Sequence, residues 1–207
     1  MLMSAYEINR NPYGTHCLIA REIGRERTVL DAGCNKGYLK TLAGNNVFYG
    51  IDHNDEDLAD AKSAGYREVY KLDLNHYEQF KSGQKFDVIV FADILEHLIY
   101  PDKALSFFTK NYLNEGGKVI ISLPNVAHFS TRLSLLLGNF DSAESGILDK
   151  THLHLYTLKT ARLFIKPCGL RIIKEKFSSN NFGKIIELFP FLGSLLGFNL
   201  IFVCQKQ

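Results

Sequence analysis

Short apolar runs alternate with segments of helical periodicity along the first 123 residues. The apolar runs are rich in β-branched and aromatic residues, which predicts strands at 28–30, 46–51, 67–72, 86–91 and 117–123. The helical pattern occupies 38–43, 55–64 and 101–112. Strands that alternate with helices predict an α/β fold, in which a parallel sheet is covered by helices on both faces.

The pattern changes after Pro124. Residues 126–137 predict an extra leucine-rich helix, and 138–150 predict a polar loop. A helix at 158–166 and two strands at 170–177 and 199–204 follow. Since ligands of open α/β sheets bind at the carboxyl ends of the strands, the insertion after the fifth strand is expected to lie beside a ligand.

The composition fits an ordinary globular protein of one domain. The chain has 207 residues, of which 46% are hydrophobic and 22% charged, and its net charge is +2. So small a net charge does not attract nucleic acid strongly, and nucleic acid is therefore not expected as a partner. The four cysteines form no CxxC pair, which favours reduced thiols and a cytoplasmic location.

Residues 188–205 carry no charge, and this uncharged stretch is long enough for a candidate membrane span. Pro190, Gly193 and Gly197 interrupt this stretch, so a loop, a short helix and a last strand are expected instead. No stable membrane insertion is predicted. Together with the leucines of 133–137, however, this segment is expected to offer an apolar patch for peripheral contact with a membrane-linked acceptor.

The segment VLDAGCNKGY, residues 29–38, combines a strand end, two glycines and a helix start. Glycines allow a sharp turn and close approach of a ligand to the backbone, and the helix N-terminus presents unpaired N–H groups. A dinucleotide fingerprint counted from Gly33 would need glycine where Asn35 and Tyr38 stand. The loop therefore favours a nucleoside ligand without a pyrophosphate, and Asp31 suits a cationic one.

Two further acids follow strands. Asp52 ends the second strand about 20 residues after Asp31, where an acid hydrogen-bonds ribose hydroxyls. Asp73 follows the third strand and is suited to accept from an adenine amino group, with the Leu74 N–H beside it. Any one of these acids also fits a helix cap or a turn, but their joint placement indicates an adenosine-type ligand.

At this point the chain resembles the class I S-adenosylmethionine-dependent methyltransferases, over roughly residues 12–177. VLDAGCNKG resembles their first motif, GIDHN the ribose-binding acid, KLDL the adenine-binding acid and FDVIVFADILEHLIYP the fourth-strand motif. The resemblance implies a three-layer Rossmann-like fold with a seven-stranded, mostly parallel sheet, an antiparallel last strand and a helical insertion after the fifth strand. A single domain over 1–207 is then expected to comprise an N-terminal helical cap (1–25), a cofactor-binding core (26–123), an acceptor-side insertion (124–157) and C-terminal helix and strands (158–207).

The same resemblance implies S-adenosylmethionine as cofactor and S-adenosylhomocysteine as product. Asp31 and Gly33 would hold the methionine end, Asp52 the ribose and Asp73 the adenine. The full set of expected cofactor residues is Asp31, Gly33, Asn35, Gly37, Tyr38, Asp52, His53, Asp73, Leu74, Ala92, Asp93 and His97. Asn35 replaces the family's middle glycine, and because Asn tolerates left-handed geometry the turn is expected to survive. Glu96 of the family's E-H pair is expected to be structural.

The segment 123–161 is similar to a subgroup of bacterial methyltransferases encoded among cell-surface polysaccharide genes. The matching residues are PNVAH at 124–128, GNFD at 138–141, THL at 151–153 and YT at 156–157. This similarity implies a saccharide or other small-molecule acceptor, methylated on oxygen. A hydroxyl acceptor needs a base, and the candidates are His128 and His152. The alternative is that these histidines cap helices or hold the insertion in place.

Several alternatives remain open from the sequence. Asp141, Glu144, Asp149, His152 and His154 match no standard ligand spacing, so no metal is expected. The acceptor atom is alternatively nitrogen, carbon or part of a quinone-like ring. A non-catalytic, cofactor-binding partner of a glycosyltransferase or acyltransferase is a further reading, and a homodimer is expected as the assembly. A nicotinamide dehydrogenase is disfavoured by Asn35 and Tyr38.

Overall fold

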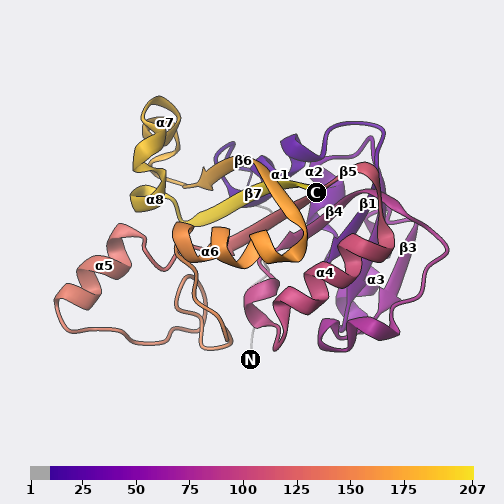
Figure 1. The fold of residues 1–207 in the computed structure, drawn as a ribbon, viewed down its shortest axis with the longest axis horizontal. Coiled ribbons are helices and arrows are strands. Elements are labelled where there is room, and N and C mark those ends of the chain that lie inside the picture. Colours follow the sequence, from indigo (N-terminus) through magenta and orange to yellow (C-terminus); the bar gives the residue numbers. More distant parts are fainter. Residues whose placement is uncertain (1–9) are drawn as a thin grey trace.

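The computed structural model describes residues 10–207 and contains a seven-stranded sheet (Figure 1). The strands are β1 Thr28–Ala32, β2 Val47–Asp52, β3 Glu68–Lys71, β4 Phe86–Ala92, β5 Leu113–Pro124, β6 Leu170–Ser178 and β7 Asn199–Lys206. Their order is β3-β2-β1-β4-β5-β7-β6, and β7 pairs antiparallel with both of its neighbours. The predicted class I methyltransferase fold with its antiparallel last strand is confirmed.

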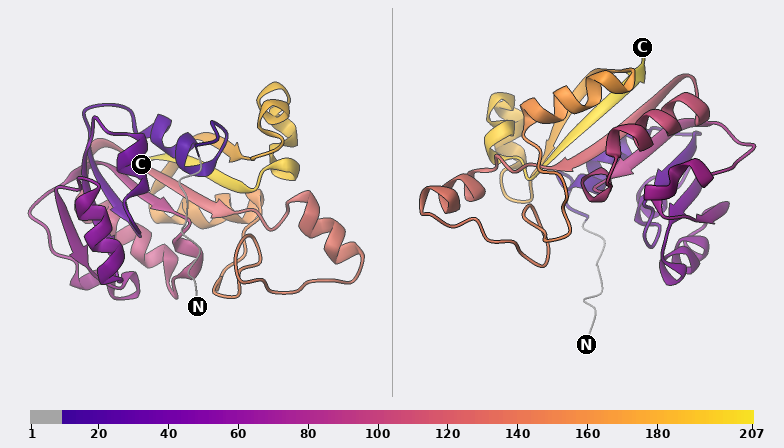
Figure 2. Two further views of the ribbon diagram at one scale, coloured as in Figure 1. Left: turned by 180° about the vertical axis from the view of Figure 1, so that it is seen from behind. Right: turned by 60° about the horizontal axis from the view of Figure 1, so that its bottom comes forward.

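Helices cover both faces of the sheet (Figure 2). The helices are α1 Thr15–Ile23, α2 Tyr38–Leu42, α3 Asp55–Ser63, α4 Pro101–Tyr112, α5 Phe129–Leu136, α6 Leu158–Ile165, α7 Gly183–Leu188 and α8 Gly193–Leu196. Short 3-10 turns are η1 Leu74–Gln79, η2 Leu95–His97, η3 Lys166–Cys168 and η4 Pro190–Leu192. Side chains of α1, α2 and α3 join one core cluster, and those of α4 and α6 join the other. The predicted cap at 1–25 is represented by α1, and its first nine residues lie outside the described range.

The central strand β4 shows why the sheet is buried on both sides. Val88 and Val90 pack into the cluster that contains α1 to α3, whereas Ile89 and Phe91 pack into the cluster that contains α4 and α6. Successive side chains of a strand point to opposite faces. A nearly continuous apolar run is therefore required here, and it is what made this strand predictable.

The helix of the insertion starts later than expected. The helix predicted at 126–137 begins at Phe129, because the His128 side chain accepts from the Ser130 N–H and caps it. The preceding Asn125 instead forms a β-bridge with Tyr156, which closes the insertion at its base. Helix α5 projects from the body at the same end as α7 and α8 (Figures 1 and 2).

The uncharged tail folds as a short turn, α8 and β7, as the sequence predicted. A side chain at Gly193 would meet the ring of Phe177, since a Cβ there would lie 2.1 Å from Cδ2. The glycines that interrupt the apolar run thus allow it to fold back on β6. Within residues 10–207, no helix has both the length and the apolar character needed to span a bilayer.

Candidate functional site

A cavity of about 510 Å³ opens at the carboxyl ends of β1, β2 and β4. It is lined mainly by the loop after β1, the end of β2 and the residues after β4. The lining residues are His16, Asp31, Gly33, Cys34, Asn35, Tyr38, Leu39, Asp52, His53, Asp57, Ala92, Asp93, Ile94, His97 and Thr151. Most of the expected cofactor residues are therefore brought together around one space.

The loop after β1 has the backbone that its sequence predicted. Gly33 has a φ of 82°, and a Cβ there would lie 2.8 Å from the side chain of Ile94. Asn35 has a φ of 45°, so asparagine takes the left-handed conformation at the position of the family's middle glycine. The Asn35 N–H donates to Asp52 at 2.9 Å, which ties the loop to the end of β2.

Asp31 is a buried carboxyl at the end of β1. Burial raises its pKa to about 7, although the Tyr66 hydroxyl opposes this shift by donating to the carboxylate at 2.6 Å. A cationic ligand close to this carboxyl would stabilise its ionised form. The site thus favours a positively charged group close to the loop.

Asp52 is held rigidly at the cavity wall. Its two oxygens accept from the N–H groups of Asn35 and Asn54, at 2.9 and 3.1 Å, and His53 Nδ1 lies 3.3 Å away. A carboxylate has about four lone-pair sites. Capacity therefore remains for hydroxyl donors of a ligand.

Three expected cofactor residues lie outside the lining of this cavity. Gly37 begins α2, and a Cβ there would come within 2.9 Å of Ala61, so this glycine serves close packing. Asp73 caps η1 by accepting from the Asn75 N–H at 2.8 Å. Leu74 is buried in the core. Gly37 thus has a packing role, and the cofactor contacts expected of Gly37, Asp73 and Leu74 stay predictions.

A second cavity of about 590 Å³ adjoins the first. Its lining comes from α1, the residues after β4, the insertion and the 178–182 and 198–199 segments: Gly14, Thr15, His16, Asp93, Glu96, His97, Pro124, His128, Phe129, Ser145, Gly146, Asp149, His152, Ser178, Ser179, Asn180, Asn181, Phe182, Phe198 and Asn199. Three of these residues, His16, Asp93 and His97, also line the first cavity. The two cavities therefore meet at these side chains.

Asp93 stands at this junction in an unusual backbone conformation. Its φ is 51°, in the left-handed region that residues other than glycine seldom adopt. The side chains of Ser122 and Asn199 each donate to Oδ1 at 2.6 Å, and the Asp93 N–H donates to Ser122 Oγ. Ser122 of β5 and Asn199 of β7 thus hold the Asp93 carboxylate in place. Strained backbone of the kind seen at Asp93 is typical of functional positions.

The two candidate bases differ in what their rings already bond. His128 Nδ1 accepts from the Ser130 N–H as the cap of α5, so in the neutral ring the proton sits on Nε2. Burial lowers the pKa of His128 and favours that neutral ring. In this tautomer Nε2 is a donor and has no lone pair, and the role of His128 as a base stays a prediction.

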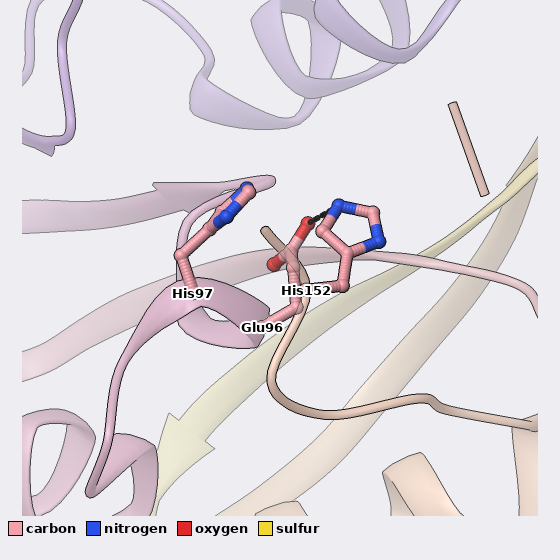
Figure 3. A group of neighbouring side chains, drawn as sticks. All are labelled: Glu96, His97 and His152. Atoms are coloured by element: carbon pink, nitrogen blue, oxygen red, sulfur yellow. Dashed lines mark ion pairs between the residues drawn. The ribbon is translucent and has the colours of Figure 1, made fainter. Parts of the chain in front are cut away.

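His152 has the opposite arrangement. Its Nδ1 lies 3.0 Å from the Ile147 carbonyl oxygen, which can only accept, so the proton is on Nδ1 and Nε2 carries the lone pair. Nε2 lies 4.0 Å from Glu96 Oε1 (Figure 3). Both Leu153 and His154 donate their N–H groups to the Glu96 carbonyl oxygen, which draws this part of the insertion onto η2.

Comparison with known proteins agrees with this architecture. A family model described as a methyltransferase domain matches residues 13–175, which is most of the chain. The chain belongs to the S-adenosylmethionine-dependent methyltransferases of class I. S-adenosylmethionine is accordingly its cofactor, and the first cavity is where this family's loop, ribose and fourth-strand motifs converge.

Curated relatives of this methyltransferase match over part of their length. The mitochondrial ubiquinone biosynthesis O-methyltransferase of Candida albicans is 29% identical over 120 residues, which cover 54% of this chain and 36% of the relative. The ribosomal protein L11 methyltransferase of Paraburkholderia phytofirmans is 28% identical over 123 residues, 57% of this chain and 39% of that protein. The matched region thus spans less than half of either relative.

Solved structures share the fold over nearly the whole chain. The N-methyltransferase NodS of Bradyrhizobium japonicum, crystallised with S-adenosylhomocysteine, has a TM-score of 0.63 at 17% identity, covering 97% of this chain and 91% of that one. A methyltransferase of Mesorhizobium loti gives a TM-score of 0.66 at 16% identity, covering 93% and 98%. At these identities the likeness concerns the fold.

Sequence reasoning missed some residues of this methyltransferase's cavities. His16 lines both of them, and burial lowers its pKa. Thr151 lines the first cavity and bonds to His97. His16 lies in no recognisable motif, and of the THL segment at 151–153 only the histidine was expected to act in the site. The packing of α1 and of the insertion on the sheet edge brings His16 and Thr151 here.

Proposed function

We propose that this methyltransferase transfers the methyl group of S-adenosylmethionine to an oxygen of a small-molecule or saccharide acceptor held in the second cavity. The observation that carries this proposal is the junction of the two cavities at His16, Asp93 and His97. Methyl transfer needs donor and acceptor in line, and such alignment contributes roughly 7–11 kcal/mol. Adjoining cavities of suitable size supply that arrangement.

In this proposal the first cavity holds the cofactor by its three parts. Asp31 and the Gly33 loop face the cationic methionine end, and Asn35 and Tyr38 complete the loop. Asp52 accepts from the ribose hydroxyls beside His53. Asp73 and the Leu74 N–H meet the adenine at the outer end. Ala92 at the end of β4, and Asp93 and His97 after it, lie towards the methyl group in this proposal.

The acceptor proton goes to His152 in the simplest form of this mechanism. The acceptor oxygen attacks the methyl carbon, the C–O bond forms as the C–S bond breaks, and the sulfonium becomes the neutral thioether of S-adenosylhomocysteine. The hydroxyl proton moves to His152 Nε2, whose lone pair is available because Nδ1–H is bonded to Ile147. His128, whose ring also bonds to the Leu196 backbone, caps the start of α5.

The nature of the acceptor rests on the lining of the second cavity. Serines, asparagines and histidines provide many donors and acceptors, as hydroxylated molecules such as saccharides require. The similarity of the insertion to methyltransferases of polysaccharide gene clusters supports the same class. A quinone-like acceptor is the second candidate, because the relative from C. albicans is named as a ubiquinone biosynthesis O-methyltransferase.

Apolar side chains surround the acceptor end of the molecule. Phe129, Phe182 and Phe198 line the second cavity, and the exposed leucines of α5 lie beyond it. We propose peripheral contact with a lipid surface that carries a membrane-linked acceptor. None of the four cysteines, all within residues 10–207, forms a disulfide, which fits a reducing compartment such as the cytoplasm.

The first test is a thermal shift with S-adenosylmethionine, S-adenosylhomocysteine and NAD in parallel. A ligand at about 100 times its Kd adds about 2.7 kcal/mol to the free energy of unfolding. Stabilisation by the two sulfur nucleosides is expected, and stabilisation by NAD alone would contradict the proposal.

A panel of saccharides and quinols with radiolabelled methyl donor then follows, in which label on an oxygen is expected. Cofactor binding without turnover on any acceptor would favour a non-catalytic partner protein.

A further inference from the structure

Glu96 is a buried carboxyl whose side-chain oxygens accept no hydrogen bond from residues 10–207. It is 0% exposed, and neither carboxylate oxygen has a hydrogen-bond partner among residues 10–207. Unsatisfied buried polar groups are costly and few in folded proteins. The expected structural role of Glu96 accounts for its backbone carbonyl oxygen, which accepts hydrogen bonds from the insertion. It does not account for a buried carboxyl side chain.

Two histidines flank this carboxyl with their proton positions fixed (Figure 3). The Thr151 hydroxyl donates to Asp149 at 2.6 Å, so at 3.1 Å it can only accept from His97 Nδ1. His152 Nδ1 donates to the Ile147 carbonyl. In both rings Nε2 therefore carries the lone pair. A histidine that ligates a metal typically donates its other N–H to a carbonyl or a similar acceptor.

The three side chains converge tightly. One ligand atom from each of Glu96, His97 and His152 lies within 4.8 Å of the others, and the two rings meet edge to face with centroids 4.8 Å apart. Two imidazole lone pairs and a buried carboxyl group thus share one space.

We propose that Glu96, His97 and His152 bind a divalent first-row transition metal ion such as Zn²⁺. Two imidazole nitrogens and one carboxylate oxygen form a known catalytic zinc set with an open fourth position. Imidazole ligands favour zinc, iron, cobalt or nickel over magnesium and calcium, which take oxygen ligands. A tetrahedral ion with bonds of about 2.0–2.2 Å sets its ligands about 3.4 Å apart. The 4.0 Å between His152 Nε2 and Glu96 Oε1 is close to that spacing.

The sequence predicted no metal, because the ligands come from separate segments. Glu96 and His97 belong to η2, whereas His152 lies in the insertion. The two segments are joined by the bonds from Leu153 and His154 to the Glu96 carbonyl. Of the five residues weighed from the sequence as ligands, which were Asp141, Glu144, Asp149, His152 and His154, only His152 belongs to this set.

The position of the ion gives it a role in the proposed function, on which this part of the inference rests. All three ligands line the acceptor cavity, and His97 also lines the cofactor cavity. An open coordination position would hold the acceptor oxygen beside the methyl group and lower the pKa of its hydroxyl. The hydroxyl proton then leaves to water in the cavity, and His152 positions the ion instead of acting as the base.

The test is titration of the chelator-treated protein with Co²⁺ and Zn²⁺, without cofactor or acceptor, by calorimetry and by the visible absorption of cobalt. One ion per chain is expected for the wild type. Glu96→Gln, His97→Ala and His152→Ala should each weaken binding at least about tenfold. His154→Ala is the matched control, because His154 lies in the same segment but its Nε2 donates to the Leu98 carbonyl at 3.0 Å. It should bind as the wild type does.

The outcomes separate this inference from the proposed function. A wild type that binds neither ion at stoichiometric concentration, or ligand variants that bind as well as it does, would overturn the metal site. Circular dichroism confirms folding, and Glu96→Gln keeps the volume of the buried side chain, so lost binding is not mistaken for unfolding. Stabilisation of the wild type, Glu96→Gln and His152→Ala by S-adenosylmethionine tests the cofactor site separately, because neither Glu96 nor His152 lines the first cavity. Metal binding without methylation of any hydroxyl would leave the ion in place and refute the oxygen acceptor.

Discussion

At the scale of single residues, Asp52 has the most direct consequence for cofactor affinity. Its carboxylate accepts from Asn35 and Asn54 and faces the cavity, so an amide in its place cannot accept as strongly from ribose hydroxyls. Hydrogen bonds to charged groups contribute about 1.5–3 kcal/mol. Asp52→Asn should therefore weaken S-adenosylmethionine binding roughly 10- to 100-fold by calorimetry. Asp55→Asn, an exposed acid paired with Lys71 outside the cavity, should bind normally.

Asp31 predicts a pH dependence of stability. Its pKa rises from 3.8 in the unfolded chain to about 7 on folding, chiefly through burial. Between these values the folded protein keeps a proton that the unfolded chain has lost, so stability falls as pH rises towards 7. At about 1.4 kcal/mol per pKa unit, Asp31 should cost about 2–3 kcal/mol between pH 5 and pH 7.

Urea unfolding of the wild type and Asp31→Asn at pH 5 and pH 8 measures this cost. The neutral variant should lack that part of the decline, while Asp55→Asn, whose acid is exposed, should follow the wild type. Equal declines in the wild type and Asp31→Asn would show that this carboxyl is ionised throughout the range.

The parts of the candidate site that could be predicted from the sequence are those whose residues lie close together in the chain. The loop with Gly33 and Asn35, and Asp52 at a strand end, lie within single motifs whose geometry follows from neighbouring residues. His152 was named, but as a base acting alone, because its approach to Glu96 depends on how the insertion packs on η2. That packing is set by bonds between distant segments, which no local pattern contains.

At the scale of elements, the cap of α6 is a testable feature. Thr157 and Thr160 form a capping box, in which the Thr157 hydroxyl accepts from the Thr160 N–H and the Thr160 hydroxyl accepts from the Thr157 N–H. Thr157→Ala removes one partner and should lower the free energy of unfolding by about 1 kcal/mol in denaturant titrations. Thr157→Ser keeps the hydroxyl and should lose much less. Similar losses in both variants would assign the effect to the methyl group.

The elements were predicted best where they are buried in the sheet. The apolar run of β4 and the turn at Pro167 and Gly169 after α6 are visible in the sequence, because burial and chain reversal each demand particular residues. The six-residue helix α7 was not predicted, since it is too short for a periodic pattern. Its Gly183 packs so closely on Tyr13 that a Cβ would lie 2.1 Å from the ring. This helix is therefore fixed by a tertiary contact.

At the scale of the whole molecule, exposed apolar side chains gather at one end. Leu136 of α5, Leu188 of α7 and Phe191 of η4 are 82%, 72% and 76% exposed, and the views of the fold place α5, α7 and α8 together there (Figure 2). Large exposed apolar patches are typical of interaction surfaces. Phe129 of α5 at this end also lines the second cavity, so a lipid surface in contact with this end would bring a membrane-linked acceptor close to the cavity proposed to hold it.

Sedimentation with phosphatidylcholine vesicles, with and without an anionic lipid, measures this contact. The wild type should pellet with the vesicles, and Leu188→Ser combined with Phe191→Ser should reduce the bound fraction about tenfold or more, since burying such a side chain contributes about 1.5–3 kcal/mol. Leu163→Ser is the matched control, because Leu163 is 62% exposed but lies on α6. A wild type that stays in the supernatant would refute the membrane contact. Equal losses in the control would mean that binding depends on general surface hydrophobicity and not on this end of the molecule.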